Sequence, residues 1–176
     1  MVNKNTDWAS YKHHFKRQEI DAKTVLLSEG KIAKRAYYIE KGSIRVWFNN
    51  MEKEVTFQFF FEGSVVSSVE SFQKGLPSMF SIESLEPCIL HSISKKDFDI
   101  IIQQSPAIKS QFEDTLFERL LLYQKLFISR IKDSPEQRYK ELLKNSPEII
   151  QRVPLHYIAS YLGITPVSLS RIRKRY

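Results

Sequence analysis

Short stretches of alternating hydrophobic and polar residues fill the chain from about Lys23 to Ile93. Ser43 to Phe48 and Glu54 to Phe60 alternate with the period of two that turns one face of a strand inward. Glycine, asparagine and proline interrupt the chain at close intervals, as they do at turns. The pattern predicts a double-sheet roll or barrel with strands at residues 24–27, 35–41, 43–48, 53–61, 79–85 and 88–93.

Two features within these strands are interpreted as core. Phe59, Phe60 and Phe61 could form an aromatic binding box, but aromatic residues on strands mostly supply buried area, so we expect them to fill the core. Cys88 lies in an apolar run and is expected to be a small buried side chain. Because it is the single cysteine, a disulfide within the chain and a cysteine-ligated iron–sulfur cluster are both excluded.

A helical period replaces the strand pattern near Asp97. Ser105 and Pro106 begin the longest predicted helix, in which hydrophobic residues recur at steps of three and four. Two interpretations stay open: the helix pairs with a second copy of the chain, or it is an intramolecular core helix. The stripe that would form the dimer consists of Phe112, Leu116, Leu120, Tyr123 and Phe127.

Further helix starts follow at Ser134-Pro135 and Ser146-Pro147, and Val153-Pro154 breaks the chain again. The whole pattern predicts an α+β fold in three parts. A double-stranded β-helix or jelly roll occupies residues 1–104, and a long connecting dimerisation helix occupies 105–132. An all-α unit follows at residues 133–176.

Residues 155–176 read as two short helices joined by a tight turn. Gly163 can take the left-handed conformation that ends a helix, and Thr165 can cap the next one. Pro166 suits its first position. With Ala159 and Leu169 on the inner faces, this spacing is typical of a DNA-reading helix-turn-helix. The competing interpretation is an ordinary helical hairpin with a solvated charged tail.

The outer face of the second helix carries the candidate DNA contacts. Arg171 suits a bidentate contact with guanine, and Val167 could meet a thymine methyl group. Thr165, Ser168, Ser170 and Lys174 are better placed for phosphates or for contacts through water.

The net charge of +7 is concentrated in the same region. Residues 131–176 hold nine Lys or Arg and four Asp or Glu, a balance of +5, whereas the preceding residues hold eighteen and sixteen, a balance of +2. A positive field over the helix-turn-helix is what contact with phosphates requires.

Several classes of protein are not expected. No run approaches the length of a membrane span and the amino-terminal segment lacks the apolar core of a secretory signal, so a cytoplasmic location and no membrane partner are expected. The four histidines form no His-x-His pair followed by a carboxylate, so no metal site is expected. No nucleophile with a partnered base and no glycine-rich phosphate loop is visible, so we expect no catalytic residues and no enzyme.

Together these motifs resemble the Crp/Fnr superfamily of transcription regulators. The segment SEGKIAKRAYYIEKGSIRVWF, with Gly30 and Gly42, is similar to the strand-turn-strand of that family's roll. FFFEG, ending at Gly63, is similar to its approach to the ligand loop, and IASYLGITPVSLSRIRK to its reading head. The resemblance covers residues 12–176. It implies a cyclic-nucleotide-binding-like sensor roll and a homodimer on double-stranded DNA with an inverted-repeat operator, with RNA polymerase as a further partner.

The chain departs from that family at the ligand loop. Its cyclic-nucleotide-binding members hold the ribose with a Gly-Glu pair and the phosphate with an Arg followed by a small hydroxyl residue. Those positions fall on Ser67-Ser68 and Ser78-Met79, which we take as candidate ligand-pocket residues. Without a carboxylate or a guanidinium there, cyclic AMP is not expected to bind tightly, so no cofactor is assigned and any other effector is unidentified.

Two further expectations remain. The family continues into a two-stranded wing where this chain stops at Tyr176, so a winged-helix type with a short or missing wing is expected. The alternative function is a roll that senses a small molecule, with a helical end that mediates protein interaction.

Overall fold

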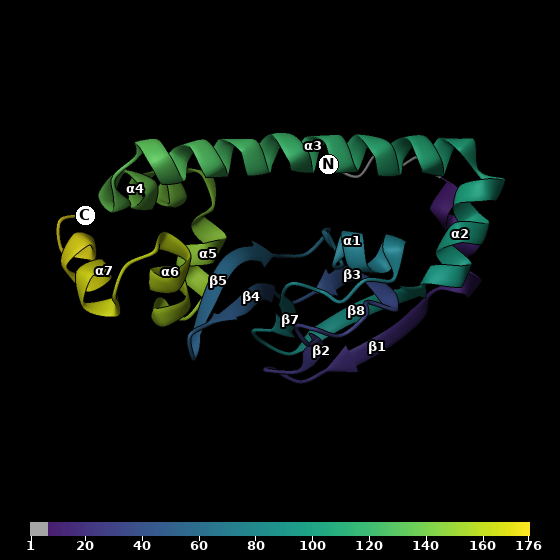
Figure 1. Ribbon diagram of the computed structural model, residues 1–176, viewed down its shortest axis with the longest axis horizontal. Helices are drawn as coiled ribbons and strands as arrows, with labels where there is room; N and C mark the ends of the chain where they lie inside the picture. Colours follow the sequence, from purple (N-terminus) through teal and green to yellow (C-terminus); the bar gives the residue numbers. More distant parts are fainter. Residues whose placement is uncertain (1–6) are drawn as a thin grey trace. The chain divides into compact units, whose positions relative to one another are not determined.

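The computed structural model describes residues 7–176 (Figure 1). Expectations that concern residues 1–6, including the start of the amino-terminal segment, lie outside this range. The described chain divides into two compact units. One, the roll unit, holds residues up to 48 together with 59–116, and the other, the helical unit, holds residues 49–58 and 117–176.

Eight antiparallel strands form two four-stranded sheets, which confirms the predicted α+β fold with its jelly roll. In one sheet the strand order is β1-β8-β3-β6 and in the other it is β2-β7-β4-β5. The bounds are β1 Lys16–Ile20, β2 Val25–Leu27, β3 Arg35–Lys41, β4 Ile44–Asn50, β5 Lys53–Phe60, β6 Val65–Val66, β7 Ser81–Ser84 and β8 Cys88–Ser94.

The inward faces of the strands form the core of the roll. Ile39 and Leu90 are opposite each other on β3 and β8, and both are fully buried. Val46 and Ile82 make the equivalent pair on β4 and β7. Phe59, Phe60 and Cys88 are buried as well, which confirms the core role predicted for them, whereas Phe61 is half-buried.

Gly42 makes the turn that joins β3 to β4. Its φ of +100° is a conformation that residues with a Cβ rarely adopt. A Cβ at this position would lie 2.5 Å from the Cys88 sulfur and 2.8 Å from the Pro87 carbonyl oxygen. The glycine is therefore required both by the backbone conformation and by the closeness of the neighbouring strand.

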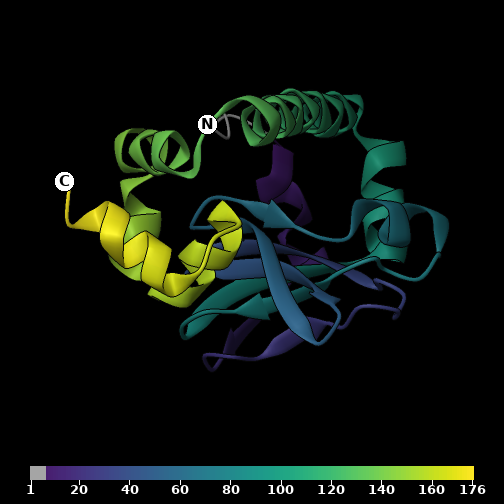
Figure 2. The ribbon, with the colours of Figure 1, turned by 60° about the vertical axis from the view of Figure 1, so that its left-hand side comes forward.

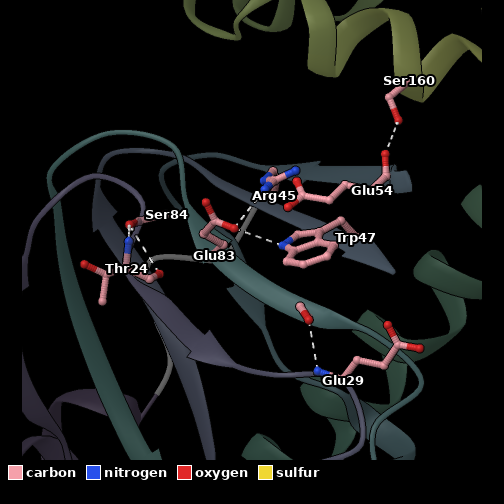
Figure 3. A network of polar contacts seen from close by, with 9 residues as sticks. Thr24, Glu29, Arg45, Trp47, Glu54, Glu83, Ser84 and Ser160 are labelled. Atoms are coloured by element: carbon pink, nitrogen blue, oxygen red, sulfur yellow. Dashed lines mark hydrogen bonds and ion pairs between the residues drawn. The ribbon is translucent and has the colours of Figure 1, made fainter. Parts of the chain in front are cut away.

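On β4 and β7 a group of polar side chains is enclosed within the roll unit (Figure 3). Arg45 and Glu83 are paired across the two strands, with 2.8 Å between Nη2 and Oε2. The indole N–H of Trp47 donates to the same carboxylate oxygen at 3.0 Å. The Arg45 guanidinium also lies 4.9 Å from the centre of the Trp47 ring, so Glu83 and Trp47 both fix its position.

Four elements of the roll unit were not predicted. β1 and β6 are strands, and the 3-10 helix η1 (Asp7–His14) and the helix α1 (Val69–Lys74) lie in segments for which no element was expected. β1 has the sequence KRQEI and pairs with β8 from Lys16 to Ile20. Because only its last residue is hydrophobic, the strand carries no alternating pattern, and pairing with a distant strand defines it.

The remaining helices begin at the predicted signals. α3 starts at Pro106, and α4 starts after Ser134, whose hydroxyl accepts from the Gln137 N–H in a full capping box. The bounds are α2 Lys95–Gln104, α3 Pro106–Lys132, α4 Pro135–Asn145, α5 Pro147–Arg152, α6 Leu155–Leu162 and α7 Pro166–Arg173, after the 3-10 helix η1 Asp7–His14. Among residues 7–176, none of the helices combines the length and the hydrophobicity of a membrane span.

Candidate DNA-binding surface

The turn between α6 and α7 has the geometry that its sequence predicted (Figure 2). Gly163 has φ +69° and ends α6 in the left-handed conformation. Its N–H donates to Ser160 O, and the N–H of Ile164 donates to Ala159 O at 3.0 Å. These bonds satisfy the last carbonyls of α6 and turn the chain toward the next helix.

Thr165 starts α7. Its hydroxyl oxygen accepts from the Ser168 N–H at 3.1 Å, and Pro166 occupies the first turn. The hydroxyl of this predicted DNA contact therefore already caps the helix. A phosphate would have to share that oxygen with the Ser168 N–H.

Burial fixes which side of α7 faces outward. Leu169 is fully buried, with Ile158, Ala159 and Leu162 of α6 also in the core of the helical unit. Residues of a helix are rotated by about 100° from one to the next. Val167, Ser170, Arg171 and Lys174 therefore share the opposite face and are all exposed, whereas Ser168 is half-buried beside it.

The charges on this face are available for a partner. Among the described residues, no carboxylate lies within salt-bridge distance of Arg171, Arg173 or Lys174. Arg175 differs, because its Nη1 lies 2.9 Å from Glu136 Oε2 on α4. Glu136 also accepts from the Tyr176 hydroxyl, which holds the pKa of this carboxyl below its usual value. Thus the unpaired Arg171 and Lys174 lie on the outward face of α7, whereas Arg173 lies on the Leu169 side, next to Ile158.

Two arginines outside the motif hold the end of α6. Arg138 of α4 donates from Nη2 to Leu162 O at 2.8 Å and from Nη1 to Asp133 O. Arg130 of α3 donates to Tyr161 O, and burial together with the Arg138 charge lowers its pKa. Cations at the negative end of a helix dipole are favourable. No local pattern signals this role, because the hydrogen-bonded partners are 24 and 31 positions apart along the chain.

A second support comes from the tip of the β4-β5 hairpin, which belongs to the helical unit. The Ser160 hydroxyl of α6 accepts from the Thr56 N–H at 2.9 Å and donates to Glu54 O at 3.2 Å. Figure 3 shows Ser160 above Glu54. One serine thereby satisfies two backbone groups on β5, the edge strand of its sheet.

The long helix α3 exposes a broad hydrophobic stripe. Of the residues predicted for dimerisation, Leu120, Tyr123 and Phe127 are exposed. Phe112 and Leu116 are half-buried, and the Phe112 ring packs edge-on against Phe98 of the roll unit, with 5.0 Å between centroids. The exposed stripe is made by Phe117, Leu120, Leu121, Phe127, Ile128 and Ile131, of which Phe117 was not predicted.

The candidate ligand-pocket residues are held by contacts within the chain. The Ser67 hydroxyl donates to Arg35 O at 3.1 Å, and the Ser78 hydroxyl donates to Phe80 O at 2.7 Å. Ser68 is buried and precedes α1 without capping it, and Met79 is 71% exposed. The structure therefore does not bring the four side chains together around a cavity among the pockets it shows.

A cation that replaces the family's phosphate-binding arginine at this loop would have to be Lys74. Its ammonium lies 3.1 Å from Glu70 one turn earlier on α1, and both side chains are exposed. Within the described chain there is also no group of three or more His, Cys, Asp or Glu that could hold a metal ion.

The roll is the part of the chain that matches a known protein family. The family described as cyclic nucleotide-binding domain matches residues 17–105. The cAMP-activated global transcriptional regulator CRP of Salmonella typhimurium is 28% identical over 100 residues, which cover 56% of this chain and 48% of that protein. The chain thus spans about half the length of the curated relatives that it matches.

Solved structures extend the likeness to the fold of nearly the whole chain. The c-di-GMP responsive global regulator CLP of Xanthomonas campestris superposes with a TM-score of 0.77 and 20% identity, over 96% of this chain and 89% of that one. A CooA variant from Carboxydothermus hydrogenoformans gives 0.76 and 17%, over 97% and 80%. The curated relatives are CRP regulators, which agrees with the resemblance of the sequence motifs to the Crp/Fnr superfamily. Because the family match covers just over half of the chain, the chain belongs to the cyclic nucleotide-binding domain family, within the Crp/Fnr superfamily.

Proposed function

We propose that this protein is a sequence-specific DNA-binding transcription regulator of the Crp/Fnr type. The observation that carries the proposal is the outward face of α7. Arg171 and Lys174 are exposed there without a carboxylate partner among the described residues, and Leu169 opposite them is fully buried. A rigid helix with unpaired cations on one side and a capped start is suited to enter a major groove.

The homodimer is part of the same proposal. The exposed stripe of α3 repeats at steps of three and four from Phe117 to Ile131, and Gln124 is the polar residue at its centre. No charged residue interrupts it, which is the pattern of a helix that pairs with a copy of itself. Two copies related by a two-fold axis would read an inverted repeat. RNA polymerase is the partner that a regulator at a promoter implies.

We infer that cyclic AMP is not the effector, although the CRP relatives are named for it. At the aligned loop positions, the Ser67 hydroxyl already donates to Arg35 O and the Ser78 hydroxyl to Phe80 O. Lys74 is paired with Glu70. A buried cyclic phosphate would lack a cation. Calorimetric titration with cyclic AMP should show no binding at micromolar concentration, and a micromolar dissociation constant would contradict this.

The decisive experiment selects bound sequences from a random pool of duplex DNA with the purified protein. An inverted repeat should emerge, and its affinity should fall steeply with salt because phosphates supply much of it. Arg171→Ala should cost about 1–3 kcal/mol at the selected site and relax base choice at one position of each half-site.

Arg175→Ala is the matched control. It removes the same charge, but from a side chain that is paired with Glu136. It should weaken all sequences by a similar, smaller factor without relaxing base choice. If no sequence is enriched from the pool, or if Arg171→Ala and Arg175→Ala behave alike, the reading role of α7 is wrong. An absence of sequence preference would favour the alternative, a sensing roll with a helical end that contacts protein.

A further inference from the structure

A groove of about 310 Å³ opens in the roll unit, beside the aligned ligand loop, whose Ser67 and Ser78 are hydrogen-bonded to groove-lining residues. It is lined by β2, by the loop that joins β2 to β3, by the start of β3 and by Ile82 of β7. Ser67, Ser68, Ser78 and Met79 do not line it. The volume is at the lower end of the range for small-molecule sites, which suits a ligand of modest size.

The groove has an apolar interior and a cationic rim. Leu27, Ala33 and Ile82 line it and are buried. Lys31, Lys34 and Arg35 line it as well, all exposed, and no carboxylate does. Among the described residues none of these three cations has an acidic partner within salt-bridge distance. The charge around the groove is therefore positive and uncompensated.

Tyr37 supplies a hydrogen-bond donor in the same place. It lines the groove with only 8% of its surface exposed, and its hydroxyl makes no hydrogen bond to the residues that the structure describes. Burial raises the pKa of this phenol, although the Arg35 charge opposes the shift. The hydroxyl is thus protonated at neutral pH. The hydroxyl oxygen is not enclosed by protein, so a ligand or water in the groove can pair with it.

The loop that carries the cations is held rigidly. The Gly30 N–H donates to Ser78 O at 2.7 Å, and the Ser78 N–H donates to Lys31 O at 2.9 Å. The Ala33 N–H donates to the buried Ser71 hydroxyl oxygen at 2.8 Å. A site whose backbone is already fixed loses little entropy when a ligand binds, so a small ligand could be held there.

We propose that this groove binds a small amphipathic anion, with its apolar part against Leu27 and Ile82 and its anionic head beside Tyr37, Arg35 and the two lysines. Cationic ligands are disfavoured because the rim repels them, and neutral ligands gain no charge attraction from it. The site goes beyond the proposed regulation of DNA and does not depend on it, since every residue involved belongs to the roll unit.

Octanoate is the probe, with neutral octanamide as the matched ligand, titrated into the full chain by calorimetry. Octanoate should bind one site with a dissociation constant on the order of 1 mM or tighter, and octanamide should bind at least about tenfold more weakly. Amide ¹⁵N shifts of Ala33, Lys34 and Arg35 should move with octanoate. Higher salt should weaken octanoate alone.

Variants then locate the site. Tyr37→Phe keeps the ring and removes the donor, so it should weaken octanoate about tenfold, and Lys31→Gln with Lys34→Gln should weaken it about three- to tenfold. The controls are Tyr38→Phe, on the other face of β3, and Lys41→Gln at the end of that strand. Both should stay within about twofold. No saturable binding, or equal losses in Tyr37→Phe and Tyr38→Phe, would overturn the proposal, whereas a failure of DNA binding would leave it standing.

Discussion

Arg45 and Glu83 illustrate how a charged pair is accommodated inside the roll. Arg45 is 2% exposed, and its guanidinium has a carboxylate at 2.8 Å and an aromatic ring at 4.9 Å. Taking both charges out of water is costly, and their attraction offsets that cost only with good geometry. The Trp47 N–H helps, because it satisfies the same oxygen of Glu83. The pair therefore depends on each of its members being present.

Glu83→Gln should destabilise the roll unit by about 3–5 kcal/mol, because it leaves a buried guanidinium without this carboxylate. The measurement is urea unfolding, followed by tryptophan fluorescence. Glu19→Gln is the control, since the Arg17–Glu19 pair has the same 2.8 Å separation but is largely exposed. It should cost less than about 1 kcal/mol. Equal losses in the two variants would mean that burial of the pair is unimportant.

At the scale of elements, α6 is fixed from two sides. Arg130 and Arg138 hold the carbonyls at its end, and Ser160 joins it to the tip of the β4-β5 hairpin. None of these three residues lies on the face proposed to read DNA. They act by fixing the orientation of α6. Ile158 and Leu162 of α6 share a common core with the buried Leu169 of α7, so the position of α7 depends on that of α6.

Arg138→Ala should destabilise the helical unit by about 1.5–3 kcal/mol, because a charged donor to two backbone carbonyls is lost. Chemical denaturation followed by helix content measures this. Lys144→Ala, on an exposed position of the same helix, should change stability by less than about 0.5 kcal/mol. DNA affinity should fall in Arg138→Ala without a change in base preference. A relaxed preference would show instead that Arg138 contacts bases.

For the whole molecule, the elements predicted from the sequence are those whose signals are local. Gly163, Thr165 and the Ser134–Gln137 capping box each fix a helix end through residues a few positions apart, so the pattern alone was sufficient. Strand β1 and helix α1 were missed because their sequences carry no period and their conformation depends on distant partners.

The candidate sites also differ in whether local sequence patterns could predict them. The outward position of Arg171 followed from helix spacing around buried Leu169. The groove beside Tyr37 did not, because it needs β2, β3, the loop between them and Ile82 of β7 to meet, and no repeating pattern connects these segments. The dimer stripe is an intermediate case: its period was visible, but Phe117 was missed and the inward packing of Phe112 depends on Phe98.

The hydrophobic stripe of α3 allows a controlled test of dimerisation, because two adjacent leucines are similarly exposed but point in different directions from the helix. Leu121 is 41% exposed and lies within the stripe, and Leu122 is 44% exposed and lies about 100° away from it. Leu121→Glu would place two carboxylates near the two-fold axis of a dimer, where they repel each other and lose water. Leu122→Glu would leave its carboxylate in solvent.

We therefore expect Leu121→Glu to sediment as a monomer and Leu122→Glu as a dimer, both with the helix content of the unaltered protein. Because two linked reading helices gain affinity from acting together, Leu121→Glu should bind an inverted repeat about 10²- to 10⁴-fold more weakly, with unchanged affinity for one half-site. Sedimentation equilibrium and DNA titration measure the two effects. An unaltered protein that is itself monomeric, or a Leu121→Glu variant that still forms dimers, would show that α3 exposes its stripe for some other purpose.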